Sequence, residues 1–178
     1  MTVITMLDLE TTGLDPEKNE ILEIAVVRID LDTLQILDTY VTKTKPEHLE
    51  TAHPRALEVN GYNEKDWLSA ISTKQALQDI YPKLYRCVPG GHNVDFDLRF
   101  LNAAYRKYGL PSPEFSDVHL DTQEIAKLLK KQKRYTGISV SLSAVAAYYG
   151  YTQPTPHRAY DDVMACIHIL RKIHTVQK

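Results

Sequence analysis

The chain has 178 residues, 43% of them hydrophobic and 25% charged, and a formal net charge of −2. This length and composition predict one compact domain spanning residues 1–178, whose core needs neither disulfides nor structural metals. The near-neutral charge excludes the markedly basic surface of a protein that coats nucleic-acid duplexes. The chain has only two cysteines, no basic leader and no apolar run of about 20 residues, which predicts a soluble, cytoplasmic protein without membrane spans.

The first half of the chain has the pattern of an antiparallel meander. Apolar and β-branched residues predict three strands, over residues 3–9, 21–29 and 34–41. The Thr11-Thr12-Gly13 sequence predicts a turn after the first strand. A loop region is expected after the third strand, because it contains Pro46, the His53-Pro54 pair and the Asn60-Gly61 pair.

The second half predicts helices separated by short strands. A helix is predicted to begin at Ser72 or Thr73, and others to cover residues 94–108, 123–131, 142–149 and 161–174, with a short strand at 118–120. Gly109, which suits a left-handed C-cap, and Gly150 are expected to end two of these helices. Strands followed by helices, with one more strand among the helices, predict a mixed sheet with helices packed on it.

Asp8 and Glu10 follow the first apolar strand and are two residues apart. In a strand, this spacing places both carboxylates on the same face. Two neighbouring carboxylates at the end of a buried strand repel each other and lose hydration, and a divalent cation removes both penalties. The alternative is a solvated strand end, which is the commoner meaning of an isolated Asp-x-Glu sequence.

A second acidic pair, Asp95 and Asp97, opens the helix predicted at 94–108, and helical periodicity distinguishes its two members. Steps of three and four residues from Asp97 follow an apolar stripe, made of Leu101, Ala104, Tyr105 and Tyr108. The same steps from Asp95 meet mostly polar residues. Asp97 is therefore predicted to face the interior and Asp95 the solvent, although an Asp in a first helical turn often serves only the helix dipole.

The same test favours Asp162 over Asp161 in the last predicted helix. From Asp162 the helical steps follow an apolar face, made of Ala165, Cys166, Ile169 and Ile173, whereas the track from Asp161 is more polar. His157 precedes this helix on a predicted loop. A loop histidine is usually a solvated bystander, but an imidazole beside a metal cluster suits water activation at neutral pH.

Four separated carboxylates suit hard cations with oxygen ligands: those of Asp8, Glu10, Asp97 and Asp162. Mg²⁺ or Mn²⁺ is favoured over Zn²⁺, which usually recruits cysteine or several histidines. Two such ions about 4 Å apart clamp the attacking and leaving oxygens of a phosphodiester during in-line displacement. In that arrangement His157 would take the proton from the attacking water.

Three motifs occur in order along nearly the whole chain. They are Asp8-Leu9-Glu10-Thr11-Thr12-Gly13-Leu14, supported by Ile21-Leu22-Glu23-Ile24-Ala25; His92-Asn93-Val94-Asp95-Phe96-Asp97; and His157-Arg158-Ala159-Tyr160-Asp161-Asp162. This ordered set resembles the DnaQ-like 3′–5′ exonucleases of the histidine-containing DEDD type. That group includes the proofreading subunit of the bacterial replicative polymerase, RNase T and oligoribonuclease.

The resemblance implies an α/β, ribonuclease H-like fold with a five-stranded mixed sheet flanked by helices. It implies a 3′–5′ exonuclease that uses two Mg²⁺ or Mn²⁺ ions to release nucleoside 5′-monophosphates from single-stranded nucleic acid. The implied metal ligands are Asp8, Glu10, Asp97 and Asp162, with His157 as general base and Glu23 as a structural residue. The implied substrate-binding residues are Thr11, Thr12, Gly13, Leu14, His92, Asn93 and Phe96, among which Leu14 would pack on the last base and His92 and Asn93 would brace the site.

Two features depart from the family pattern. The Cys87-Val88-Pro89-Gly90-Gly91 stretch is a poor strand, because proline would confine it to a sheet edge or end it early. Asp95 adds a negative charge close to the expected site. Neither feature removes a catalytic residue.

The substrate and partners stay open at this point. DNA 3′ ends are favoured weakly over RNA, because the first and third motifs look most like those of polymerase proofreaders. The alternatives are an RNA trimmer similar to the dimeric oligoribonuclease and RNase T, a polymerase-bound proofreading subunit, and a non-catalytic binding module. A basic stretch fits a strand guide and a solvated helix end equally well: Lys127, Lys130, Lys131, Lys133 and Arg134, followed by Tyr135.

Overall fold

The computed structural model describes residues 2–155 and 157–176 of the chain. Its elements in chain order are β1 (Val3–Thr11), β2 (Ile21–Asp30), β3 (Ile36–Lys45), the 3₁₀ helix η1 (Leu49–Thr51), α1 (Pro54–Asn60), β4 (Ile71–Ser72), α2 (Thr73–Leu84), β5 (Val88–Gly91), α3 (Val94–Lys107), β6 (Leu120–Asp121), α4 (Thr122–Lys131), α5 (Leu142–Tyr148) and α6 (Ala159–Val176). Met1, Pro156, Gln177 and Lys178 lie outside the described residues. Within the described ranges, no helix is both long and apolar enough to cross a membrane.

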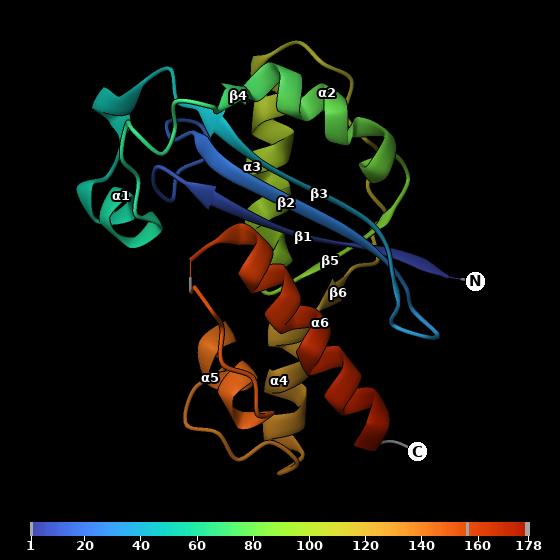
Figure 1. Cartoon of the computed structure of the whole chain (residues 1–178). Helices are drawn as coiled ribbons and strands as arrows, with labels where there is room; N and C mark the ends of the chain where they lie inside the picture. Colours follow the sequence, from blue (N-terminus) through green and yellow to red (C-terminus); the bar gives the residue numbers. More distant parts are fainter. Residues whose placement is uncertain (1, 156, 177–178) are drawn as a thin grey trace.

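The strands form one mixed sheet in the order β4-β3-β2-β1-β5-β6 (Figure 1). β1, β2 and β3 are antiparallel neighbours, as the meander pattern predicts. β5 is parallel to β1, and β6 is parallel to β5. The predicted α/β class and mixed sheet are confirmed, but the sheet has six strands and not five, because the two-residue strand β4 pairs with the outer edge of β3.

Helices cover both faces of this sheet, and alternate residues of β1 pack against the helices on opposite faces. Leu7 and Leu9 pack in the cluster that contains residues of α2 and α3. Ile4 and Met6 pack in the second cluster, which contains Val163, Cys166, Ile167 and Leu170 of α6. Figure 1 shows α2 and α3 on one side of the sheet and α4, α5 and α6 on the other. Asp8 and Glu10 continue the Ile4 and Met6 face, so the strand directs both carboxylates towards α6.

The loop expected after β3 is the clearest error of the sequence-based prediction, since it contains the helix α1. The chain supplies the signals of a short helix there. Pro54 occupies its first turn, and His53 Nδ1 accepts a hydrogen bond from the Arg55 N–H (3.2 Å). Gly61 ends the helix in the left-handed conformation, with φ of 63°. The proline and glycine that suggested a loop are therefore the boundaries of a helix.

Several strand boundaries also differ from the prediction, among them the end of β3, which lies at Lys45 and not at Val41. β3 begins at Ile36 and not at Leu34, because residues after β2 form a turn in which Asp30 Oδ1 accepts the N–H groups of Asp32 (2.9 Å) and Thr33 (2.8 Å). β1 continues to Thr11, which places Glu10 inside the strand. The short strand predicted at 118–120 lies at Leu120–Asp121.

The proline-containing strand β5 lies inside the sheet, between β1 and β6, and not at an edge. The expectation that Pro89 would confine it to an edge is therefore wrong. The ladder explains why proline is tolerated: β6 pairs only with Gly90 and Gly91, so Pro89 has no partner residue on that side. Gly90 and Gly91 suit this crowded position, because a Cβ on Gly90 would lie 2.5 Å from Met6 Sδ and one on Gly91 2.9 Å from the Leu7 carbonyl oxygen.

Candidate active site

The carboxylates of the first motif lie at the end of β1, in the middle of the sheet. Glu10 is 8% exposed, and its register partner on β2 is a second glutamate, Glu23, which is 2% exposed. Arg158, at the start of the third motif, donates from Nε to Glu23 Oε2 (2.8 Å). Glu23 therefore has its own cation, in agreement with its predicted structural role, whereas Glu10 has none of its own.

Asp97 reaches the same point from the first turn of α3. The helix begins where β5 ends, and its apolar stripe packs on the sheet, which buries Asp97 to 3% exposure. Asp97 Oδ1 accepts the N–H of Leu9 (2.9 Å), which lies between Asp8 and Glu10 in β1. The side chain of Asp95, by contrast, is 70% exposed. The periodicity argument thus chose the inward-facing member of this pair.

Asp162 and His157 come from the start of α6 and the loop before it. Asp162 is 9% exposed, and one of its carboxylate oxygens accepts a hydrogen bond from Gln153 Nε2. His157 is exposed and has a left-handed backbone, with φ of 62°. Ligand atoms of Glu10, His157 and Asp162 lie within 4.8 Å of one another. Residues from the first and third motifs, which are almost 150 positions apart, thus meet at one place.

The electrostatics of the cluster are those of negative charges confined in a poorly hydrated site. Burial, followed by the charges of Asp162, Glu23 and Asp97, raises the pKa of Glu10 to about 8. Burial and the charge of Asp161 raise the pKa of Asp162 to about 7, against hydrogen bonds from His157 and Gln153. The pKa values of Asp8 and Asp97 are also raised, chiefly by burial and by neighbouring carboxylates.

This donor set fits divalent cations. Glu10, Asp97 and Asp162 are buried and Asp8 is half-buried, and the cation that lowers the pKa of Glu10, Arg158, is held by Glu23. Asp8, Glu10, Asp97 and Asp162 offer hard oxygen ligands, which Mg²⁺ and Mn²⁺ prefer. A cation there would offset both the burial and the mutual repulsion that raise the four pKa values.

The raised pKa values predict how metal and pH act on stability. In the metal-free protein, Glu10 and Asp162 bind protons more tightly when folded than at their ordinary pKa values of 4.5 and 3.8. Their contribution to stability is therefore complete below about pH 4 and is lost as the pH rises through 7 to 8. We expect the melting temperature in EDTA to fall by on the order of 5 °C between pH 5.5 and 8.5.

Mg²⁺ should restore the lost stability, and more at pH 8.5 than at pH 5.5, because metal and protons compete for the same oxygens. Calorimetry at both pH values, with EDTA and with Mg²⁺, measures the effect. The Asp162→Asn variant is the control, since it lacks one of the titrating groups and should show a weaker pH dependence. Equal melting temperatures with and without Mg²⁺ at pH 8.5 would contradict a metal site.

A cleft of about 1240 Å³ opens beside the cluster and is lined by both Glu10 and His157. Among the residues predicted to bind substrate, Thr11, Gly13, Leu14 and Phe96 line it. Leu14 is 83% exposed. Thr12 is fully buried, and its hydroxyl accepts the N–H of Glu20 (2.8 Å), so its side chain shapes the turn.

His92 and Asn93 are not among the residues that line the cleft. The ring of His92 joins Thr122 Oγ1 (2.9 Å, from Nδ1) to the Val140 carbonyl oxygen (3.0 Å, from Nε2). Burial lowers the pKa of His92, and the charge of Lys127 acts in the same direction. Asn93 has a left-handed backbone, with φ of 64°, directly before α3. His92 thus links the end of β5 to the start of α4 and to residue 140, and the Asn93 N–H donates to Asp121. Their predicted bracing role in the site stays a prediction.

Asp121 is a functional residue that the sequence interpretation missed. Its carboxylate accepts the N–H groups of Asn93 and Val94 (3.0 Å each) at the start of α3. It also caps α4 through the N–H groups of Gln123 (2.7 Å) and Glu124 (3.3 Å). An Asp followed three residues later by Glu is a recognisable N-terminal helix signal. Its second role, to fix the helix that carries Asp97, has no local signal.

With this geometry in view, the relatives of the chain identify its family. The chain matches the RNase_T family model, described as Exonuclease, over residues 5–170. The chain belongs to this exonuclease family. The family predicted from the three motifs is thereby confirmed.

Its relatives include much longer proteins. The chain is 32% identical to a PolC-type DNA polymerase III of Thermotoga petrophila over 179 residues, covering 97% of this chain and 12% of that protein. It is 31% identical to the 3′-5′ exonuclease DinG of Staphylococcus aureus over 162 residues, covering 91% of this chain and 17% of that protein. Its fold is also that of E. coli Exonuclease I in complex with a dT13 oligonucleotide, with a TM-score of 0.87 at 17% identity, covering 99% of this chain and 42% of that one.

Proposed function

We propose that the chain hydrolyses phosphodiester bonds from the 3′ end of single-stranded nucleic acid and releases nucleoside 5′-monophosphates. The observation that carries the proposal is that ligand atoms of Glu10, Asp162 and His157 lie within 4.8 Å of one another beside a cleft of about 1240 Å³. Besides burial, the charge of the nearby Asp97 raises the pKa of Glu10, and the charges of Asp97, Asp162 and Glu10 raise that of Asp8. Buried carboxylates with raised pKa values are costly for folding, and such groups gather at functional sites, so their presence together in a cleft supports a catalytic use.

In this proposal Asp8, Glu10, Asp97 and Asp162 hold two divalent cations, Mg²⁺ or Mn²⁺. When bound, such ions supply an activated water and stabilise the charge that develops on the leaving oxygen. His157 accepts the proton of the attacking water, and its place on an exposed loop gives its ring access to solvent for release of that proton. Leu14 and Phe96 offer apolar surface in the cleft for the terminal base.

DNA is proposed as the substrate in preference to RNA. Among the residues described, the cleft contains no dedicated group that we assign to the 2′-hydroxyl. The relatives include a DNA polymerase, and Exonuclease I has been solved with a DNA oligonucleotide, which adds support. RNA trimming and action as the proofreading part of a polymerase, with a polymerase or a second copy as partner, stay as alternatives.

A digestion assay tests the proposal. Single-stranded DNA and RNA of matched sequence, labelled at the 5′ end, are incubated with Mg²⁺, with Mn²⁺ or with EDTA. We expect a ladder that shortens from the 3′ end, requires metal and forms faster on DNA. A circular single-stranded DNA of the same composition should stay intact. Cutting of the circle, or no cleavage of any substrate, would overturn the proposal.

In the structure, the basic stretch predicted as a strand guide borders a groove of about 510 Å³. The groove is lined by Lys127, Lys130, Lys131 and residues 138–140. Residues 127–134 carry five basic groups and no acidic one, so the rest of the chain has a net charge of −7 against −2 for the whole. The carbonyl oxygen of Val140, which lines the groove, also accepts a hydrogen bond from His92, the first residue of the second motif. We propose that phosphates several nucleotides from the 3′ end bind here.

Replacing Lys127 and Lys131 together by Gln should therefore weaken the binding of long substrates only. We expect KM for a 20-nucleotide strand to rise about 10-fold and the salt dependence of binding to weaken by about 0.7 per lost phosphate contact, with a trinucleotide unaffected. Steady-state kinetics at several salt concentrations measure both. Lys74→Gln on α2, across the sheet, is the matched control. An equal loss on the trinucleotide would contradict a remote strand guide.

A further inference from the structure

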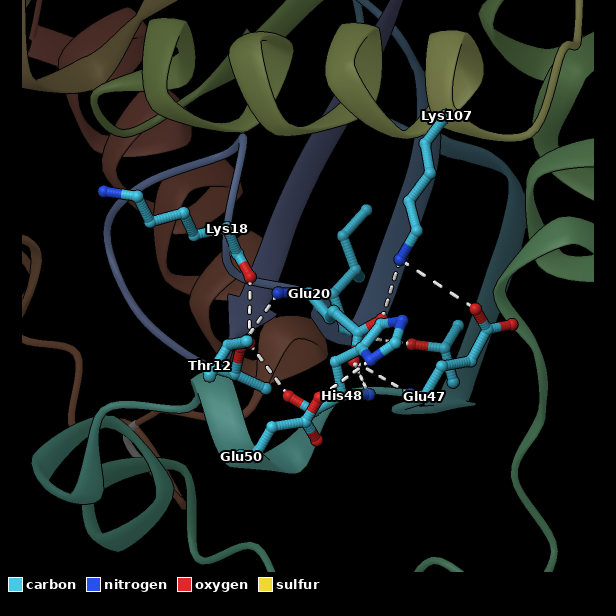
Figure 2. Close-up of polar contacts among 10 residues, drawn as sticks. Thr12, Lys18, Glu20, Glu47, His48, Glu50 and Lys107 are labelled. Carbon is cyan, nitrogen blue, oxygen red and sulfur yellow. Dashed lines mark hydrogen bonds and ion pairs between the residues drawn. The ribbon is translucent and has the colours of Figure 1, made fainter.

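Glu20 is a buried carboxylate outside the metal cluster, at the wall of the same cleft. It lies directly before β2 and is 8% exposed. Figure 2 shows its side chain at the centre of a polar network. Oε2 accepts the N–H groups of Glu47 and His48 (2.8 Å each), and Oε1 accepts from Lys107 Nζ (2.9 Å). One carboxylate thus joins β2 to the chain before η1 and to the end of α3.

The backbone of Glu20 makes a second pair of bonds, to the turn of the first motif. Its carbonyl accepts the N–H of Thr12 (2.8 Å), and its own N–H donates to Thr12 Oγ1 (2.8 Å). The chain that Glu20 holds at residues 47 and 48 leads into α1, whose residues line the cleft. Two further bonds join that chain to the turn, from the His53 N–H to the Thr12 carbonyl oxygen (2.7 Å) and from Asn60 Nδ2 to the Thr11 carbonyl oxygen (2.8 Å).

We propose that Glu20 is a positioning residue for the nucleotide-binding cleft. It sets the distance between the turn that carries Leu14 and the segment that leads to α1, and Lys107 ties both to the helix that carries Phe96 and Asp97. This inference rests on the proposed function. Glu20 touches no reacting atom, so it acts on how tightly the terminal nucleotide is held and not on the chemical step.

The chemistry of the junction requires a carboxylate. Three donors converge on Glu20, and Lys107 Nζ lies nearer to a carboxylate oxygen of Glu20 (2.9 Å) than to one of Glu47 (3.9 Å). Charge-assisted hydrogen bonds of this kind are about twice as strong as neutral ones. Glutamine has the same shape but only one acceptor oxygen, so its amide N–H₂ would face either Lys107 or the two backbone N–H groups. Either the hydrogen bond from Lys107 or those from the two backbone N–H groups should then be lost.

The test compares Glu20→Gln with the wild type in two measurements, the kinetics on a single-stranded oligonucleotide and the affinity for dTMP as a product. We expect KM and the dTMP Kd each to rise about 10-fold, which is about 1.4 kcal/mol, with kcat within about 3-fold of wild type. Glu114→Gln is the control. Glu114 forms an exposed ion pair with Arg86, and neither residue lines the cleft, so both constants should stay unchanged.

Lys107→Met is a second variant that removes only the tie to α3 and leaves the bonds to residues 47 and 48 intact. It should raise KM and the dTMP Kd by about 3-fold, and it tests the inference even if Glu20→Gln fails to fold. Wild-type constants in the folded variants, or a loss confined to kcat, would overturn the positioning role. A wild-type protein that binds dTMP but never digests a strand would overturn the proposed function instead, and the dTMP affinities would still decide this inference.

Discussion

Asp162→Asn is expected to lower kcat at least about 10³-fold while the protein stays folded. Asp162 lies at the start of α6 with a carboxylate oxygen within 4.8 Å of ligand atoms of Glu10 and His157, so its replacement removes one ligand of the proposed cation site. Asparagine keeps the shape and removes the charge. Because burial makes the charged form of Asp162 unfavourable in the metal-free protein, the variant should melt no lower than wild type in EDTA at pH 8.

Asp161→Asn is the control for this substitution. The two residues are neighbours in one helical turn, and both are acidic, but Asp161 is not among the groups whose ligand atoms converge. It should keep most of the activity. Its charge contributes to the raised pKa of Asp162, so its removal should also shift the pH dependence of kcat to slightly lower pH. Full activity in Asp162→Asn would disprove the assignment of the site.

His157→Ala is expected to lower kcat by about 10²- to 10⁴-fold with little change in KM or in the Mg²⁺ concentration needed for half-maximal activity. The imidazole lies beside Glu10 and Asp162 but is exposed, so its removal leaves no cavity in the core. Kinetics across pH 6–9 measure the effect. The loss should be largest near neutral pH, where the histidine acts as a base, and smaller at high pH, where hydroxide is available.

His119→Ala is the matched control, because His119 lies beside Asp95 on the exposed side of α3 and not among the converging groups. Its variant should keep wild-type kcat. If His157→Ala also did so, the proton would have to leave the attacking water by another route, and the role of His157 would be limited to holding the cation or the substrate.

The positions of the four carboxylates proposed as metal ligands were predictable because each lies on an element with strong periodicity. The apolar stripes of α3 and α6 are long enough to separate Asp97 from Asp95 and Asp162 from Asp161, and the alternation of β1 places Asp8 and Glu10 together. The ordered motifs then gave the fold class. These patterns are local in sequence, so they can be recognised without knowledge of tertiary contacts.

The connections were harder to predict, because their structure depends on partners far away in the chain. α1 is short, so its proline and glycine were read as a loop although they mark its two ends. Gly90 and Gly91 weaken the strand signal of β5 in the sequence. They suit this strand nevertheless, because Met6 and the Leu7 carbonyl oxygen leave no room there for a larger side chain. The roles of Glu20 and Asp121 rest on bonds across 27 or more residues, which no pattern in the sequence shows.

The carboxylate of Asp121 has a consequence for how the chain tolerates changes in length. It binds the starts of α3 and α4 directly, so the relation of these helices does not depend on the chain that connects them. That connection, from residue 109 to residue 119, contains no helix or strand. Insertions or deletions in its exposed parts should thus be accepted without displacing Asp97. The position of the carboxylate cluster is therefore independent of the length of this connection.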